Sequence, residues 1–244
     1  MTRIALAIAI AVFVGASSTA HAQSAAVERG YITGAADLLV AGSTFTDTIH
    51  PIEFAEAATI TTSYPSKTTI GFAVGGGARV WRRLSLGLEV GRVSRSADAD
   101  ISAQVPHPFL FNTPRSVSGS ASGIDRAELA VHIIAAWVAP LSDRWQLSVG
   151  GGPSWISVDQ SVVSDITVSQ TYPYDTATFA SATTQQVSKG RAGFNVGAEA
   201  AYLFRPHAGL AVGARYAHAH VPLTSTASTD AGGAHVTAGL RLRF

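Results

Sequence analysis

Charged side chains recur at alternate positions within apolar, Gly-rich stretches, and this spacing is the first feature that could carry chemistry. Residues two positions apart lie on the same face of a strand, so each stretch presents its charges on one face. Both signs occur in the set: Arg79, Glu89, Glu128, Arg191, Glu199, Arg215, Arg241 and Arg243. Inside a narrow barrel such charges must pair, because an unpaired buried charge is costly. We therefore predict that these charges form a paired network that plugs the lumen of a barrel. The alternative is a narrow pore that opens when the pairs rearrange.

Serine and histidine residues are the next candidates for chemistry. Ser148 and Ser154 share a strand face, but no His lies close to them in the sequence to act as the base that a serine nucleophile needs. His218 and His220 could hold a transition metal with Asp230, but no third ligand has a diagnostic spacing. We expect these histidines to be solvated rim residues, and we predict no catalytic residues, no metal and no cofactor.

Strands with two unlike faces must position the charges. Apolar residues occupy every second position in segments of about ten residues, which is the period of a strand. These segments are Ile70–Val80, Leu84–Gly91, Glu128–Trp137, Gln146–Trp155, Arg191–Tyr202, Gly209–Tyr216 and His235–Phe244. Another, at about Gly30 to Leu38, alternates less clearly, so its register stays open. We predict an all-β fold: an eight-stranded antiparallel up-and-down transmembrane β-barrel.

The cost of exposing charge to lipid decides which face points outward. An Arg on the lipid face costs roughly 2 to 4 kcal/mol at the bilayer midplane, whereas a lumen of Gly leaves room for long side chains that pair. A closed barrel also satisfies every backbone amide in lipid. The sequence therefore favours a membrane barrel over a soluble barrel with an apolar interior.

Connection lengths and aromatic residues support the same arrangement. Short connections at Trp81–Arg83, Ala139–Arg144 and Phe204–His207 alternate with long ones at Val40–Lys67, Arg95–Asp125, Asp159–Lys189 and Val221–Gly232. Outer-membrane barrels have short periplasmic turns and longer external loops, so both termini should lie at the short-turn end. An aromatic girdle is expected at the membrane interfaces. Its predicted members are Trp81, Trp137, Trp145, Trp155, Tyr202, Phe204 and Tyr216.

The N-terminal segment and the composition indicate that the chain is exported across the inner membrane. Arg3, the apolar run Ile4–Val14 and the sequence Ala20-His21-Ala22 predict a signal peptide at 1–22, which leaves 23–244 as one barrel domain. Charged residues make up 14% of the chain, below the roughly 25% of soluble proteins, and Cys is absent. The formal net charge of +1 offers no electrostatic footprint for nucleic acid.

The C-terminal segment carries a resemblance to a known family. Val236-Thr237-Ala238-Gly239-Leu240-Arg241-Leu242-Arg243-Phe244, with Gly150-Gly151-Gly152-Pro153 and the turn at Phe204–Leu210, resembles the OmpA-like or OmpX-like outer-membrane β-barrels over about Gly30 to Phe244. The resemblance implies a terminal strand read by the barrel-insertion machinery through Leu240, Leu242 and Phe244. The resemblance covers the barrel alone, and no peptidoglycan-binding domain is expected, since the sequence ends at Phe244.

The predicted function is a non-enzymatic envelope protein whose surface loops mediate adhesion or other interactions. The best loop candidates for binding are aromatic: Tyr64, Phe109, Phe111, Tyr172 and Tyr174. A narrow pore or small-solute channel is the first alternative, and a lipid A-modifying enzyme is the second. The expected partners are outer-membrane lipids, the insertion machinery and host or surface ligands, but not nucleic acid, and the expected state is a monomer.

Overall fold

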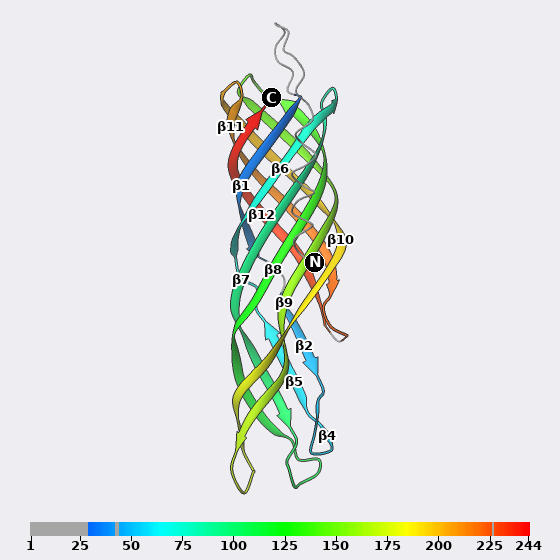
Figure 1. Cartoon of the computed structure of the whole chain (residues 1–244), viewed down its shortest axis with the longest axis vertical. Helices are drawn as coiled ribbons and strands as arrows, with labels where there is room; N and C mark the ends of the chain where they lie inside the picture. The colour runs from blue at the N-terminus through cyan, green and yellow to red at the C-terminus, as the bar shows by residue number, and fades with distance from the viewer. Residues whose placement is uncertain (1–28, 42–43, 226) are drawn as a thin grey trace.

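The computed structural model describes residues 29–41, 44–225 and 227–244. The predicted signal peptide lies outside these residues. The described chain is almost wholly antiparallel strand (Figure 1). Its strands are β1 (Gly30–Ala41), β2 (Phe45–Ile49), β3 (Ile52–Glu53), β4 (Glu56–Ala57), β5 (Thr59–Tyr64), β6 (Thr69–Trp81), β7 (Leu84–Val105), β8 (Arg115–Pro140), β9 (Trp145–Gln170), β10 (Ala177–Arg205), β11 (Ala208–Pro222) and β12 (Ser228–Arg243). The described residues contain no helix that is long and apolar enough to cross a membrane.

Eight of these strands close into a ring, as predicted. The order β1-β6-β7-β8-β9-β10-β11-β12 returns to β1, and every neighbouring pair is antiparallel. β1 closes the ring in a defined register, with Leu38 opposite Ile70 on β6 and Val236 on β12. Gly30 N donates to Phe244 O at 2.9 Å, so the start of β1 and the C-terminus meet at the short-turn end (Figure 1).

Within the ring, apolar side chains point outward and small or charged ones point inward. Ile70, Leu86 and Val212 are half to three-quarters exposed on the outer face. A Cβ added to Gly75 would lie 3.0 Å from the side chain of Glu89, so this glycine makes room for the carboxylate arm. The predicted face assignment is therefore confirmed.

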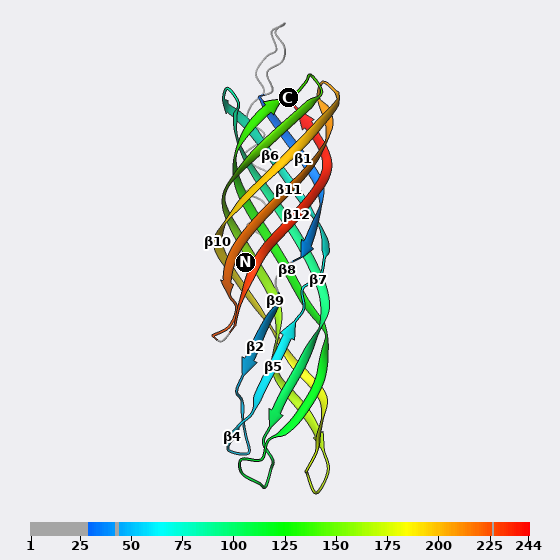
Figure 2. The same ribbon diagram turned by 180° about the vertical axis from the view of Figure 1, so that it is seen from behind.

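The prediction that four segments form long loops is wrong, because most of their residues form strands that continue those of the ring. β7 has 22 residues, β8 and β9 have 26 each, and β10 has 29, whereas a membrane-spanning strand needs only about 9–11. The β2–β5 hairpin adds to this wall by pairing β5 with the far end of β7. The result is a long extension beyond the ring, visible in the lower half of Figure 2. We call this region, built from β2 to β5 and the far parts of β7 to β10, the extension.

The extension has its own apolar core, enclosed by polar outer faces. On β7, Ala99, Ile101, Ala103 and Val105 are buried while the residues between them are exposed. β8 and β9 pair only from the Arg126–Gln160 pair toward the short turns, so beyond that point the β9–β10 hairpin separates from β8. The core fills the space between the hairpins. A half-buried strand in water has this alternation, which is why Ser- and Thr-rich segments form strands here.

Candidate functional site: the distal tips and the lumen

Three hairpin tips carry large exposed apolar side chains at the end of the extension, far from the start of β1 and from the C-terminus (Figure 1). Phe109 and Phe111, between β7 and β8, are 71% and 72% exposed, and Tyr172, between β9 and β10, is 80% exposed. Phe109 packs on Tyr174 at 5.5 Å between ring centroids, and Tyr172 packs on Tyr174 at 6.0 Å. We call this surface the distal platform. Its members are Ile52, Phe54, Phe109, Leu110, Phe111, Tyr172 and Tyr174.

Buried polar contacts fasten the tips to one another. Arg115 is almost fully buried and donates to Gln170 Oε1 at 2.6 Å, to Tyr174 O at 3.0 Å and to Pro106 O at 2.7 Å. This single side chain therefore joins the β7–β8 and β9–β10 tips. Asn112 N donates to Glu56 Oε1 at 2.7 Å, which joins the β3–β4 turn to the same assembly.

The acidic residues around the distal platform outnumber the basic ones. Glu53, Glu56 and Asp175 lie in the tips, and Arg115 is the only Lys or Arg in the described segments 50–58, 106–115 and 170–176. Burial raises the pKa of Glu53 above its ordinary value, and nearby Asp165 adds to the rise. The platform therefore becomes less negative as the pH falls toward the acidic range.

The predicted loop aromatics divide into two groups. Phe109, Phe111, Tyr172 and Tyr174 come together in the distal platform. Tyr64 does not, and its prediction as a surface contact is wrong. Its ring is buried in the core of the extension and stacks on Phe45 at 4.4 Å. Alternating burial along β5 explains the difference, because Tyr64 faces inward on a strand.

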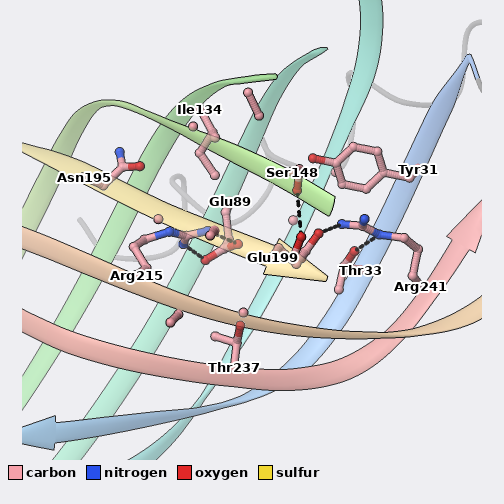
Figure 3. A pocket seen from close by; sticks show the side chains of 18 of the residues that line it. Tyr31, Thr33, Glu89, Ile134, Ser148, Asn195, Glu199, Arg215, Thr237 and Arg241 are labelled. Carbon is pink, nitrogen blue, oxygen red and sulfur yellow. Dashed lines mark hydrogen bonds and ion pairs between the residues drawn. The ribbon is translucent and has the colours of Figure 1, made fainter. Parts of the chain in front are cut away.

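The lumen of the ring contains two ion pairs formed by four residues of the predicted charge network. Arg215 binds both carboxylate oxygens of Glu89, with Nη2 to Oε2 at 2.9 Å, and Arg241 pairs with Glu199 (Figure 3). Arg241 also donates to Thr33 at 3.0 Å and lies over the Tyr31 ring at 4.1 Å. A cavity of about 50 Å³ separates the two ion pairs, enough for one or two waters. The ring interior is therefore filled by paired side chains.

A second polar cluster closes the lumen where the ring meets the extension. Arg126 binds Glu128 at 2.8 Å and also contacts Gln160 and Thr229, and all four side chains are buried. Glu128 Oε2 accepts from Gly232 N at 2.9 Å. Sequence reasoning named Glu128 but missed Arg126, which stands at the edge of a segment interpreted as loop. We call this set the junction cluster.

Three arginines of the predicted network lie elsewhere. Arg79 and Arg243 are half-buried toward the short-turn end. Arg191 is exposed, and its prediction as a lumen charge is wrong. β10 pairs with β11 only up to Phe194, so Arg191 extends past the closed ring although it follows the inward parity of its strand.

The predicted aromatic girdle lies on the outer face of the ring. Trp81, Trp137 and Trp145 are half to two-thirds exposed near the short turns, and Tyr202 packs on Trp145 at 5.0 Å. Trp155 and Tyr216 are exposed toward the other rim. The exposed side chains Phe204, Leu240, Leu242 and Phe244 share the outer face at the short-turn end. These outer-face positions suit side chains that contact lipid. The role of Leu240, Leu242 and Phe244 as an insertion signal stays a prediction.

The sequence matches the family described as outer membrane protein beta-barrel domain over residues 8–244. The chain is an outer-membrane β-barrel protein. It is located in the outer membrane, and its ring is the membrane-spanning part.

The chain is also similar to several solved structures, each at low sequence identity. The outer membrane protein OprG from Pseudomonas aeruginosa is 11% identical over 89% of this chain and 96% of its own, with a TM-score of 0.49. The Neisserial surface protein A is 13% identical over 88% and 97%, with a TM-score of 0.43. The outer membrane protease OmpT from Escherichia coli is 10% identical over 91% and 100%, with a TM-score of 0.45. A comparison with curated proteins finds no match. These similarities are too low to transfer an activity to this barrel protein.

The serine and histidine candidates are placed differently from the sequence expectation. Ser154 Oγ lies 2.7 Å from Nδ1 of His132, a histidine that sequence reasoning did not connect to it, and Asn195 Nδ2 donates to Ser154 at 2.9 Å. Strand register brings His132 and Ser154 opposite each other on β8 and β9. All three side chains are buried in the lumen. The contact pairs the Ser154 hydroxyl with two polar side chains inside the lumen.

The histidine pair lies at the rim of the barrel. His220 binds Asp230 at 3.0 Å and is mostly exposed, while His218 stacks against Tyr216. In the part of the chain that the structure describes, no three His, Asp or Glu side chains are grouped closely enough to hold a metal ion. The structure therefore brings Asp230 to His220, as the sequence allowed, without completing a ligand set.

Proposed function

We propose that this outer-membrane barrel is a non-enzymatic surface protein that binds other surfaces through its distal platform. One observation carries the proposal: Arg115 ties the β7–β8 and β9–β10 tips together, and these two tips expose Phe109, Phe111 and Tyr172 to solvent. Contiguous exposed aromatic patches are uncommon on proteins without a binding role. Tying the tips together beforehand lowers the entropic cost of binding.

The arrangement of the chain supports presentation to the outside. Short turns face the periplasm in outer-membrane barrels, so the extension should project away from the cell. The extension core gives the platform a rigid stalk, because the hairpins that carry the tips share buried side chains. We propose lipids around the girdle, the insertion machinery at Leu240, Leu242 and Phe244, and a monomeric state.

The pore alternative fits the structure less well. Two ion pairs and the junction cluster occupy the lumen, and the apolar core of the extension lies directly beyond them. A conducting path would have to separate buried charges, which is costly. Single-channel recording on the purified barrel should show no conductance steps above the bare bilayer.

An enzyme is the third candidate because Ser154 contacts His132. Catalysis requires a substrate to reach the serine oxygen, and both side chains are almost fully buried. We therefore expect no labelling of the folded protein by a fluorophosphonate probe. Labelling that disappears in Ser154→Ala would reverse this assignment.

The adhesion proposal is tested by displaying the full chain in a non-adherent bacterial host. Retention on surfaces coated with collagen, laminin or epithelial cells is compared for the natural chain and for a variant with Phe109→Ser, Phe111→Ser and Tyr172→Ser. The natural chain should raise retention over the empty host on at least one surface, and the variant should lose that gain. Ser102→Ala with Ser118→Ala, on exposed outer faces of β7 and β8, serves as the control. Equal retention by the platform variant would reject the proposal.

A further inference from the structure

The wall of the extension has a gap on one side. The β11–β12 hairpin turns back at Pro222 and Ser228, about midway along the molecule, while the other hairpins continue to the tips (Figures 1 and 2). β10 pairs with β11 only from Phe194 toward the short turns. From Ala177 to Gly193 it pairs with β9 alone among the described residues. One edge of β10 is therefore without a neighbouring strand where the hairpin ends.

The open edge borders a sizeable cavity. The cavity is an open groove of about 370 Å³. Its lining comes from the end of β2, from Val162–Ser164 on β9, from Gln185 on β10 and from Thr224–Ser225 in the hairpin tip. We call this gap, with the Thr183–Ala192 edge of β10, the β10 slot. Its volume falls within the range of ligand-binding pockets.

The two sides of the β10 slot differ in how they are covered. The hairpin tip leans toward β2, where Thr224 Oγ1 lies 3.5 Å from the buried carboxylate of Asp47. On the β10 side, Thr183 to Gln186 are exposed on both faces of the strand. Alternation should bury every second residue, as it does on neighbouring β9. The inner face of β10 is therefore open to solvent along this stretch.

The middle of the open edge, from Thr184 to Ser188, lacks the usual protection against strand pairing, whereas a register shift lies between Thr183 and Thr184 and two cations follow Ser188. Natural edge strands carry charges, Pro or strong bulges that prevent another strand from adding. Residues Thr183 to Ser188 hold no charge and no Pro, and β10 pairs with β9 in regular register from Thr184 onward. Charges enter only at Lys189 and Arg191, which share the face of Gln185 and are exposed.

We propose that the β10 slot binds an extended segment of a partner polypeptide, which adds to β10 as a further strand. Only a strand supplies backbone donors and acceptors at the spacing that an unpaired edge presents. Alternate side chains of the segment enter the cavity over the buried floor of Val162 and Val163. Lys189 and Arg191 favour a segment with a carboxylate at the end nearest the membrane. This site is separate from the distal platform, so the two proposals can fail independently.

The test is hydrogen–deuterium exchange on the full chain in detergent, with a defined probe. The probe is a short synthetic peptide of alternating Thr and Val with Asp at one end. On saturation with the peptide, alternate amides between Thr183 and Ala192 should slow by about tenfold or more, because every second backbone N–H faces the free edge. The same peptide methylated on alternate backbone nitrogens should give no protection. Unchanged exchange with the unmodified peptide at saturating concentration would overturn the proposal.

A charge-reversal variant tests the role of the two cations. Lys189→Glu with Arg191→Glu should weaken binding of the Asp-containing peptide by about tenfold or more at low salt. Lys67→Glu, which changes another exposed cation outside the slot, should leave binding unchanged. Heat-modified electrophoretic mobility confirms that each variant is folded. Protection of Thr183–Ala192 that appears without peptide and disappears on dilution would assign the edge to a second copy of this chain instead, which also overturns the proposal.

Discussion

The ring and the extension share four strands but bury opposite kinds of side chain. On β7, the apolar residues Leu86 and Leu88 point outward in the ring, whereas Ile101 and Val105 point inward in the extension. The period of two is the same in both regions. The surroundings differ: lipid accepts apolar side chains on the outside of the ring, and water requires polar ones on the outside of the extension. The solvent around a strand therefore decides which of its faces is apolar.

The exchange of faces has a structural consequence at the boundary. On the ring side of the boundary the interior is held by ion pairs, and on the extension side it is held by an apolar core. The junction cluster lies between these interiors and satisfies the last buried charges before the core begins. Its loss should therefore have the largest effect on the molecule.

Arg126→Met should be the most destabilising of the changes considered. It leaves Glu128 buried without its cation, which typically costs about 3–5 kcal/mol of unfolding free energy. Urea unfolding of the barrel in lipid vesicles, followed by tryptophan fluorescence, measures the loss. The double variant Arg126→Met with Glu128→Leu should recover most of it, because no unpaired charge remains. An equally unstable double variant would show that the junction is held by packing rather than by its ion pair.

Ile101→Ala tests the apolar core of the extension. Removing a large buried side chain typically costs about 2–5 kcal/mol, and the loss should appear as faster amide exchange along β7 from Ala97 to Val105. Leu86→Ala, on the lipid face of the same strand, provides the matched control. Its effect should be much smaller and confined to the ring. Equal effects of the two variants would contradict the division of β7 into two environments.

The fold of the ring was predictable because lipid imposes one strict rule on its outer face. Apolar residues at alternate positions, with Gly and paired charges between them, indicated both the strands and their direction. The extension was missed because its strands alternate small apolar residues with Ser, Thr and Asp, a composition also typical of loops. The segment from Ala97 to Val105 contained the signal, since Ala99, Ile101 and Ala103 repeat at every second position.

The candidate site was predictable only in part. Exposed aromatics suggested Phe109, Phe111 and Tyr172 as loop contacts, but no local pattern could show that three tips meet. Arg115 makes its contacts across 55 and 59 residues of sequence, to Gln170 and Tyr174. The contact between His132 and Ser154 likewise depends on strand register over 22 residues. Contacts of this kind follow from the fold rather than from spacing.

Placing a charge on the outer face should separate the two regions directly. Val212→Arg, near the middle of β11 in the ring, should cost roughly 2–4 kcal/mol because it exposes a cation to lipid. Ser102→Arg, on the outer face of the extension, should change the unfolding free energy by less than about 0.5 kcal/mol. Folding yield into vesicles and urea midpoints measure both. A tolerated Val212→Arg would mean that the lipid boundary does not reach this position.

Tyr64→Phe should have a smaller effect than Arg126→Met, Ile101→Ala or Val212→Arg, and one that depends on pH. The Tyr64 hydroxyl accepts a hydrogen bond from Val163 N at 2.7 Å, and losing one such bond costs about 0.5–1.5 kcal/mol.

Burial raises the pKa of Tyr64 above its ordinary value of 10.0. A group whose pKa is higher in the folded state contributes stability below its unfolded pKa and loses it as the pH rises. The natural extension should therefore weaken above about pH 10 more steeply than the Tyr64→Phe variant. Amide exchange on β5 and β9, compared at pH 8 and above 10 after correction for the intrinsic rate, measures the difference. Identical pH dependence in the two proteins would mean that the hydroxyl is solvated and that the core of the extension is open on this side.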